Sequence, residues 1–361
     1  MASFGHGGNA KEISRKNKLE YDKIIDFSAN INPLGMADSI RKEIVENLNK
    51  IEKYPDITYF ELKAAISKFE NICAENIILG NGAAEVLFNV VRGIKPKNAL
   101  VLAPTFSEYE EAIRAVNGEI IYYKLIEKND FHIQEDILDY INSKLDLIFI
   151  CNPNNPTGVI TSKDLLIKIL FKAKQNNVIV IIDESFLDFI EEDLSMVSYI
   201  NEYYNLVIIK SLTKFFALPG LRIGYGLCRS AILQEELQKI TPAWNINVLA
   251  EVAVKAGLND KKYISKSRKC LISEREYLYR ELKQISELKV YEPSVNFILF
   301  KTLAKIDLKD ELLKKNILIR SCSNYNGLSD SYYRIAVRNH EENSILIKNL
   351  KKIFEENGKR E

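Results

Sequence analysis

From about residue 75, short apolar runs alternate with longer stretches in which apolar residues recur every three or four positions. The runs predict strands, and the three-to-four-residue period predicts helices with one buried face. This alternation is typical of an α/β fold, in which helices cover both faces of a mostly parallel sheet. The predicted strands are 77–79, 99–103, 119–123, 145–151, 178–182, 206–209 and 222–228. The predicted helices between them are 83–91, 106–116 and 163–176.

The pattern changes on both sides of this region. A helix is predicted over 39–51, after a mixed N-terminal stretch. Beyond the last strand the sequence predicts a smaller α+β unit, with helices at 247–256, 263–285 and 341–356 and strands at 297–300, 317–319 and 333–337. We therefore expect three parts, an N-terminal segment (1–40), a large domain (41–243) and a small C-terminal domain (244–361).

Composition narrows the possible partners. The 361 residues include 50 basic and 49 acidic side chains, so the charge gives no reason to expect a nucleic-acid or membrane partner. The N-terminus lacks the basic region and apolar core of a signal peptide. Five scattered cysteines are expected to be reduced, as in a cytoplasmic protein, and three histidines do not favour a metal centre.

Polar and glycine-rich motifs directly follow five of the predicted strands or strand-like runs. They occupy 80–84, 104–109, 152–158, 183–186 and 211–214. In sheets of this kind, ligands bind beyond the carboxyl ends of the strands. The shared position of the motifs therefore predicts one binding site at that edge.

The central motif places Lys214 among phosphate-binding side chains. Ser211, Thr213 and Arg222 lie within twelve residues of one another, and apolar residues follow Lys214. A buried lysine beside cations has a lowered pKa and is available as a nucleophile, whereas most lysines simply lie on the surface. A cofactor with both a carbonyl group and a phosphate would suit this motif, because the lysine can react with the carbonyl and the neighbouring side chains can bind the phosphate. This chemistry points to pyridoxal 5'-phosphate, with Lys214 as the Schiff-base residue.

Asp183 ends the apolar run 178–182 and is the candidate partner of a pyridinium nitrogen. A carboxylate at the end of a buried strand is costly unless it is paired, and a helix or turn cap is the alternative role. An ion pair with the ring nitrogen would keep the ring an electron sink. Glu184, the next residue, is expected to point elsewhere.

Three more motifs could complete the cofactor site. The turn formed by Gly82, Ala83 and Ala84 opens a helix, whose N–H groups bind phosphate well. Asn155 could donate to the phenolate oxygen of the ring. Phe106 could stack on the ring, although it could equally pack in the core.

Two arginines suggest an anionic substrate. Arg320 and Arg334 follow or interrupt apolar runs, so their guanidinium groups are expected to enter a cleft. Arg338 is a third candidate, with a salt bridge as the alternative. His6 could bind a phosphate or a carboxylate, or have no role.

These motifs together resemble the fold-type I pyridoxal-phosphate enzymes of the histidinol-phosphate aminotransferase group. The resemblance rests on N-P-N-N-P-T-G (152–158), D-E-S-F (183–186), S-L-T-K (211–214) and G-L-R-I-G-Y (220–225). Further motifs resemble the decarboxylases of this group, which act on a phosphorylated amino acid in cobalamin biosynthesis. They are H-G-G-N (6–9), D-F-S-A-N-I-N-P-L-G (26–35), Y-P-D (54–56), I-L-I-R-S-C-S-N-Y (317–325) and Y-Y-R-I-A-V-R (332–338).

The resemblance implies an aspartate aminotransferase-like fold and a homodimer with a shared active site. Tyr54 would reach the cofactor phosphate of the other subunit, and the N-terminal segment would cover the substrate. Arg334 would meet the substrate carboxylate, with Arg320, His6 and Asn32 near its anionic groups.

One residue differs from the aminotransferase pattern in a way that bears on the reaction. Aminotransferases of this group usually carry Tyr where this chain has Phe186, whereas the similar decarboxylases also have Phe. Decarboxylation is therefore the favoured reaction. Histidinol-phosphate transamination, phosphoserine as the substrate, and a non-catalytic role in binding the cofactor remain the alternatives.

Overall fold

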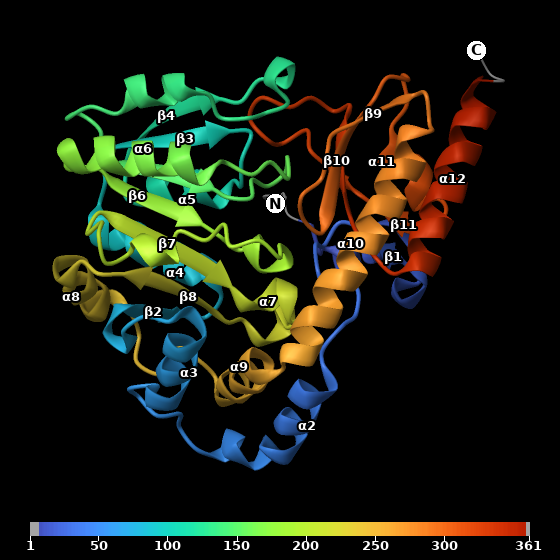
Figure 1. Cartoon of the computed structure of the whole chain (residues 1–361). Helices are drawn as coiled ribbons and strands as arrows, with labels where there is room; N and C mark the ends of the chain where they lie inside the picture. The colour runs from blue at the N-terminus through green and yellow to red at the C-terminus, as the bar shows by residue number, and fades with distance from the viewer. Residues whose placement is uncertain (1–6, 359–361) are drawn as a thin grey trace.

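The computed structural model describes residues 7–358, which form a large sheet with helices on both faces and a smaller sheet beside it (Figure 1). The seven strands of the large sheet are β2 (Ile77–Gly80), β3 (Asn98–Ala103), β4 (Glu119–Lys124), β5 (Leu147–Cys151), β6 (Ile179–Asp183), β7 (Leu206–Ser211) and β8 (Gly224–Cys228). Their order is β2-β8-β7-β6-β5-β3-β4, and only β8 runs antiparallel to its neighbours. The predicted α/β fold with a mostly parallel sheet is confirmed.

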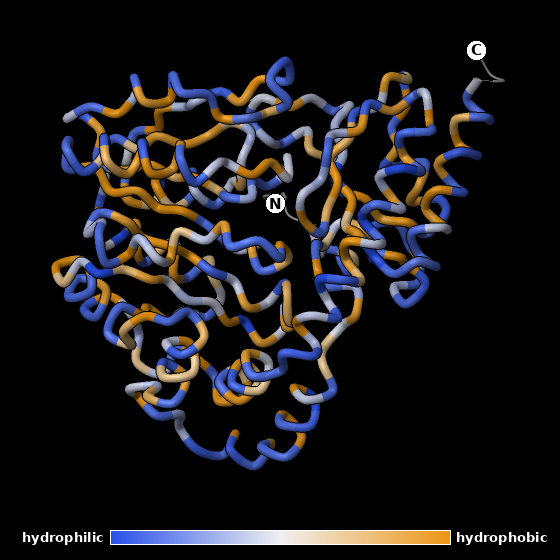
Figure 2. Tube along the Cα trace, viewed as in Figure 1, coloured by the Kyte–Doolittle hydropathy of each residue, from blue (hydrophilic) through white to orange (hydrophobic). Residues whose placement is uncertain are grey.

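Alternate residues of the strands enter two apolar layers. In Figure 2 much of the trace along the large sheet has the orange colour of hydrophobic residues. Helices α4 (Ala83–Ile94), α5 (Glu108–Arg114) and α8 (Ala231–Ile240) cover one face. Helices α3 (Phe60–Glu70) and α6 (Lys163–Gln175) contribute to the layer on the other face. A strand residue that faces one layer therefore has neighbours in the chain that face the other.

Several predicted elements differ by a few residues in extent from those in the structure, and two of these differences have a local cause. The strand predicted over 222–228 begins at Gly224, because Arg222 has a left-handed backbone with φ of +53°. The helix predicted over 39–51 ends earlier, since α2 spans Asp38–Glu46 and a 3-10 turn follows at Leu48–Glu52. The Asn47 side chain donates to the Glu43 carbonyl at 2.8 Å, which ends the helix locally.

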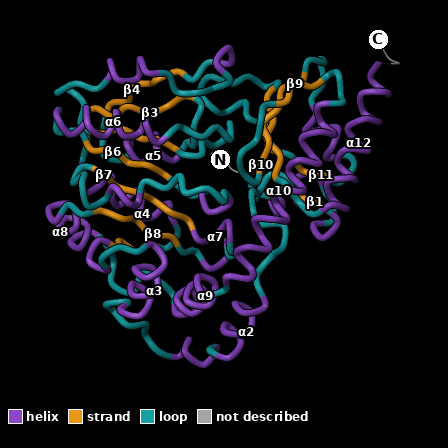
Figure 3. The backbone as a smooth tube through the Cα atoms, viewed as in Figure 1, coloured by secondary structure: helices purple, strands orange, loops and turns teal. Residues whose placement is uncertain are grey.

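The second sheet contains β9 (Leu288–Val290), β10 (Phe297–Thr302), β12 (Arg320–Ser321) and β13 (Tyr332–Ala336), in the order β12-β13-β10-β9. Near it β1 (Ile25–Asp26) pairs in parallel with β11 (Ile317–Leu318), so the N-terminal segment joins the C-terminal part. The helices of this half are α1 (Ala10–Asn17), α10 (Lys261–Lys283), α11 (Leu308–Leu313) and α12 (His340–Gly358). Figure 3 shows α10 running between the two halves. No helix within residues 7–358 is both long and apolar enough to cross a membrane.

The predicted division at 1–40, 41–243 and 244–361 stays a prediction, and one helix bears on its second border. Helix α9 (Val248–Asn259) packs against α2 and α3, at the base of the large half in Figure 1. A Cβ added to Gly257 in this helix would lie 2.9 Å from the Phe216 ring. These contacts place α9 with the large half, on the other side of the predicted border.

Glu127 links a loop after β4 to the second sheet. Its carboxylate accepts hydrogen bonds from Tyr291 at 2.7 Å and Tyr332 at 2.6 Å, and it pairs with Lys289 at 2.8 Å and Lys301 at 3.1 Å. Burial alone would raise the pKa of this carboxyl, but the four donors offset burial and hold the pKa well below its usual 4.5.

We predict that Glu127→Gln lowers the melting temperature at neutral pH. Because the folded pKa is depressed, the stabilisation is present above about pH 4.5 and is lost as the pH falls further. The difference in melting temperature between the wild type and the variant should therefore shrink in acid. Glu135→Gln is a matched control, because Glu135 is exposed and pairs only with Lys168 among the described residues. A difference that stays constant from neutral to acid pH would contradict the prediction.

Candidate active site

A cavity of about 490 Å³ lies at the carboxyl ends of the strands of the large sheet. The N-terminal segment closes one side of it with Gly7, Gly8 and Ser28–Ile31, and Tyr325 and Arg334 of the second half also line it. Ten of the residues predicted for the site line the cavity: Ala83, Ala84, Phe106, Asn155, Asp183, Ser211, Thr213, Lys214, Arg222 and Arg334. The fold thus brings together side chains that are more than 200 residues apart.

Lys214 lies in the single-turn helix α7 (Leu212–Phe215), which directly follows β7. Its Nζ is 4.8 Å from the centre of the Phe186 ring. Burial lowers the pKa of Lys214, and the nearby Arg222 and Arg334 lower it further, against an opposing effect of Asp183. The amine therefore loses its proton more easily than an exposed lysine, which is the direction predicted from the sequence.

Asp183 is the last residue of β6, and its carboxylate is held from two sides. Tyr109 donates to one oxygen at 2.8 Å, and the Ser185 backbone N–H donates to the other at 2.9 Å. Tyr109 stacks on Phe149 at 4.7 Å, which restricts the phenol ring. Burial, together with the charge of Asp183, raises the pKa of Tyr109 well above its usual value, so the phenol stays a donor. The sequence analysis missed Tyr109, although it lies within the motif at 104–109.

The predicted phosphate-binding groups meet where α4 begins. Gly82 precedes the helix with φ of +90°, and a Cβ there would lie 2.7 Å from the Arg222 Nη2. Ser211 and Thr213 place their hydroxyl oxygens 2.9 Å apart. Hydroxyl groups, a guanidinium group and the N–H groups of a helix N-terminus are the donors that bind a phosphate dianion.

Asn155 and Arg334 form a connected pair on the opposite side of the cavity. Arg334 is 5% exposed and donates to the Asn155 carboxamide oxygen at 2.5 Å and to the Ser28 carbonyl at 2.9 Å. The Tyr325 hydroxyl also donates to the Asn155 oxygen, at 3.4 Å. With its oxygen engaged, Asn155 can offer its NH₂ group to a ligand. The Nε of Arg334 is buried and makes no hydrogen bond within the described structure.

Five of the other predicted residues lie outside the cavity lining, and His6 lies outside the described residues. Gly82 packs against the guanidinium group of Arg222. Arg320 donates to the Asn324 carboxamide at 2.7 Å and lies over the Tyr325 ring at 5.4 Å. Tyr54 is 80% exposed and packs on Trp244. Arg338 forms the salt bridge that was its alternative, with Glu342 at 2.9 Å.

Asn32 is the fifth of these residues, and its position corrects the expectation that it meets the substrate. Its side chain points into the protein, where Nδ2 donates to the Phe215 carbonyl at 2.8 Å, the Ser267 hydroxyl at 2.9 Å and the Tyr263 hydroxyl at 3.1 Å. Asn30 lines the cavity instead, and its buried oxygen has no hydrogen-bond partner among residues 7–358. Both asparagines flank Ile31, so only the direction of the loop distinguishes them.

The comparisons with known proteins agree with this geometry. Residues 22–350 match the family described as "Aminotransferase class I and II". The chain belongs to this family. It is 36% identical over 357 residues to a threonine-phosphate decarboxylase of Salmonella typhimurium, with 98% of each chain covered. It is 32% identical to a histidinol-phosphate aminotransferase of Methanococcus aeolicus, covering 96% of this chain and 94% of that protein. The solved structure of the histidinol-phosphate aminotransferase from Clostridium acetobutylicum superposes with a TM-score of 0.85 at 33% identity, covering 91% and 98% of the two chains.

The cofactor of this aminotransferase-family enzyme is pyridoxal 5'-phosphate. The donor set fits it: a readily deprotonated lysine, a buried carboxylate held at two oxygens, and a phosphate-binding corner where Gly82 leaves no room for a side chain. Among residues 7–358, no group of three or more His, Cys, Asp or Glu side chains could hold a metal ion.

We predict that Asn32→Ala lowers the free energy of unfolding by about 2–4 kcal/mol, because buried polar groups lose their partners. Denaturant unfolding of the protein without cofactor measures this loss. Asn30→Ala is the matched control and should cost clearly less stability. Equal losses in the two variants would contradict the structural role of Asn32.

Proposed function

We propose that this enzyme decarboxylates O-phospho-L-threonine, giving CO₂ and (R)-1-amino-2-propanol O-2-phosphate, as a cytoplasmic step of cobalamin biosynthesis. The observation that carries the proposal is Phe186 in the cavity wall, 4.8 Å from Lys214. The resemblance to aminotransferases predicts a tyrosine there, and the resemblance to the decarboxylases predicts phenylalanine. The 36% identity to the Salmonella typhimurium protein across both chains is further support.

The bound cofactor supplies an electron sink for the bond that breaks at the substrate Cα. Lys214 would hold the cofactor aldehyde and later return a proton to Cα. Asp183 would hold the ring nitrogen, and the Asn155 amide would donate to the ring oxygen. Ser211, Thr213 and Arg222 would bind the phosphate, together with the helix turn at 82–84.

Arg334 is our candidate for binding the substrate carboxylate. Asn155 and Ser28 hold two of its nitrogens, while its buried Nε has no partner among the described residues. A guanidinium group held in this way can orient one carboxylate relative to Lys214. Asn30 lines the same cavity and could accept a hydrogen bond from the substrate. Arg320 and His6 remain proposed contacts of the anionic groups of the substrate.

Three other functions are distinguishable. A histidinol-phosphate aminotransferase would use the same cofactor-binding residues, and the similarity to the Methanococcus aeolicus protein supports this alternative. A decarboxylase of O-phosphoserine would differ by one methyl group, which discriminates by only ~1–3 kcal/mol. A non-catalytic protein would bind the cofactor without turnover.

We predict CO₂ release from phosphothreonine, at a higher kcat/KM than from phosphoserine. Histidinol phosphate with 2-oxoglutarate should give no amino transfer. Amino transfer without CO₂ release would identify an aminotransferase. Cofactor binding with no turnover of any substrate would identify a non-catalytic protein.

Lys214→Ala provides the control for the whole scheme. This variant should lose turnover and the visible absorbance of the bound cofactor together, because both depend on the covalent link. Full activity in Lys214→Ala would refute the assignment.

We further propose that the enzyme is a homodimer in which Tyr54 reaches the cofactor phosphate of the other subunit. Tyr54 and its apolar neighbours Ile51, Ile57 and Phe60 are exposed in the single chain, and Trp244 packs beside Tyr54 at 4.7 Å. A row of exposed apolar side chains is typical of an interface.

Light scattering should give twice the 41.4 kDa mass of the chain. Tyr54→Phe should keep that mass and weaken cofactor binding several-fold, because only the hydroxyl is lost. A monomer that binds the cofactor as tightly as the wild type would contradict this proposal.

A further inference from the structure

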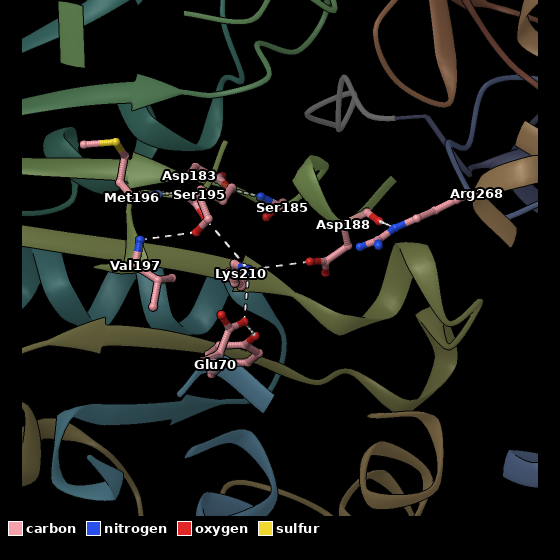
Figure 4. Close-up of polar contacts among 11 residues, drawn as sticks. Glu70, Asp183, Ser185, Asp188, Ser195, Met196, Val197, Lys210 and Arg268 are labelled. Carbon is pink, nitrogen blue, oxygen red and sulfur yellow. Dashed lines mark hydrogen bonds and ion pairs between the residues drawn. The ribbon is translucent and has the colours of Figure 1, made fainter. Parts of the chain in front are cut away.

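A second group of charged side chains lies behind the wall of the cavity. Lys210, in β7, is 4% exposed, and its Nζ lies 3.0 Å from Glu70 and 3.5 Å from Asp188 (Figure 4). The same Nζ lies 3.8 Å from Glu184. Tyr225 of β8 also donates to Glu70. We call Lys210, Glu70, Glu184 and Asp188 the Lys210 cluster.

The cluster and the cavity share two short chain segments. Asp183 lines the cavity, while the next residue, Glu184, points away from the cavity as predicted and belongs to the cluster. Ser211 lines the cavity, while the preceding residue, Lys210, faces the cluster. Neighbouring residues of a strand point to opposite faces, so each segment holds one residue on each side of the wall.

The ion pair between Lys210 and Glu184 therefore connects two chain segments that line the cavity, on the side that faces away from the cavity. One ends in Asp183, and the other continues into α7 and Lys214. The Glu184 backbone N–H also donates to the Ile209 carbonyl at 2.8 Å, which joins the same segments. The Ser195 hydroxyl and the Met196 N–H donate to the Glu184 carboxyl at 2.6 and 2.8 Å, so its position is well defined.

Glu70 and Arg268 extend these connections to two helices. Glu70 is the last residue of α3, and it is the nearest carboxylate to Lys210. Arg268 of α10 donates to the Asp188 carbonyl at 2.9 Å and lies 6.0 Å from the Phe215 ring, next to Lys214 in the chain. The cluster and Arg268 thus connect β6, β7 and α7 to helices α3 and α10.

The charges of the cluster do not balance. Three carboxyl groups face one ammonium group, and Arg268 adds a second cation at the edge. Burial raises the pKa of Glu184 to about 7 against the opposing effect of Lys210. Burial alone would lower the pKa of Lys210, but Asp188, Glu70 and Glu184 more than offset it and raise the pKa, so Lys210 stays charged. A permanent buried cation is thus the common partner of three carboxyl groups.

We propose that Lys210 is a positioning residue that sets the distance between Asp183 and Lys214. These two groups would hold opposite parts of the cofactor, the ring nitrogen and the aldehyde, so their separation determines how well both are engaged. The inference rests on the roles proposed above for Asp183 and Lys214. Lys210 itself does not line the cavity and acts only through the two segments.

The test measures cofactor binding rather than turnover. Lys210→Met should raise the dissociation constant of pyridoxal 5'-phosphate at least fivefold and shift the pH at which its visible absorbance changes. Lys210→Arg keeps the cation and should stay within twofold of the wild type. Lys255→Met removes a cation that pairs with Glu61 and Glu251 outside the cavity lining, and should leave binding unchanged.

A merely structural role gives a different result. In that case Lys210→Met lowers the melting temperature of the protein without cofactor but leaves the dissociation constant and the absorbance profile unchanged, which overturns the proposal. If Lys210→Met fails to fold, Glu70→Gln takes its place. This variant keeps the shape of the side chain and removes the surplus carboxylate, so it is expected to fold. A dissociation constant at least threefold above the wild type supports the proposal, and an unchanged one overturns it.

The outcomes separate this inference from the proposed function. If Lys214→Ala keeps the visible absorbance, the covalent role of Lys214 fails. If Lys214→Ala loses it while Lys210→Met binds like the wild type, only the role of Lys210 fails.

Discussion

Parallel strands end at one edge of a sheet, and this constraint decides where the charged groups of the protein lie. β5, β6 and β7 end in Cys151, Asp183 and Ser211, all of which line the cavity. Most residues of these strands are apolar, and the charged residue within β7, Lys210, is paired with carboxyl groups. The other polar residues therefore lie together at the strand ends. Every other part of the site is arranged around this edge.

Charge at such an edge must be balanced because little water reaches it. On the cavity side, Asp183 is opposed by Lys214, with Arg222 and Arg334 nearby. These cations help to lower the pKa of Lys214, and the carboxylate partly offsets that effect. On the opposite side of the same strand ends, the charge of Lys210 is the partner of the carboxyl groups of the Lys210 cluster. The alternating direction of strand side chains separates the two sets by the thickness of the backbone.

The same arrangement explains how members of one family can differ in the reaction that they catalyse. The groups that would hold the cofactor come from the large sheet and the turns that follow its strands. The groups that would select the bond to be broken come from elsewhere, since Arg334 belongs to β13 and Asn30 to the N-terminal segment. The pairing of β1 with β11 and the contact of Arg334 with the Ser28 carbonyl bring these parts together. Relatives with similar large sheets can therefore differ in reaction, as the decarboxylase and aminotransferase relatives do.

The order of residues along the chain was enough to predict the sheet, the edge where the cavity lies, and the lysine and aspartate that line it. These features depend on local periodicity and on the position of a residue at the end of a strand, and both are visible in a sequence. Tertiary contacts decided the rest. Asn30 and Asn32 differ only in the direction that their loop takes over Phe215 and Ser267. Nothing in the sequence singles out Lys210, because its three carboxylate partners come from the end of α3 and from the turn after β6. A sequence shows which side chains are available, but the partner that each one meets depends on packing between segments that are distant in the chain.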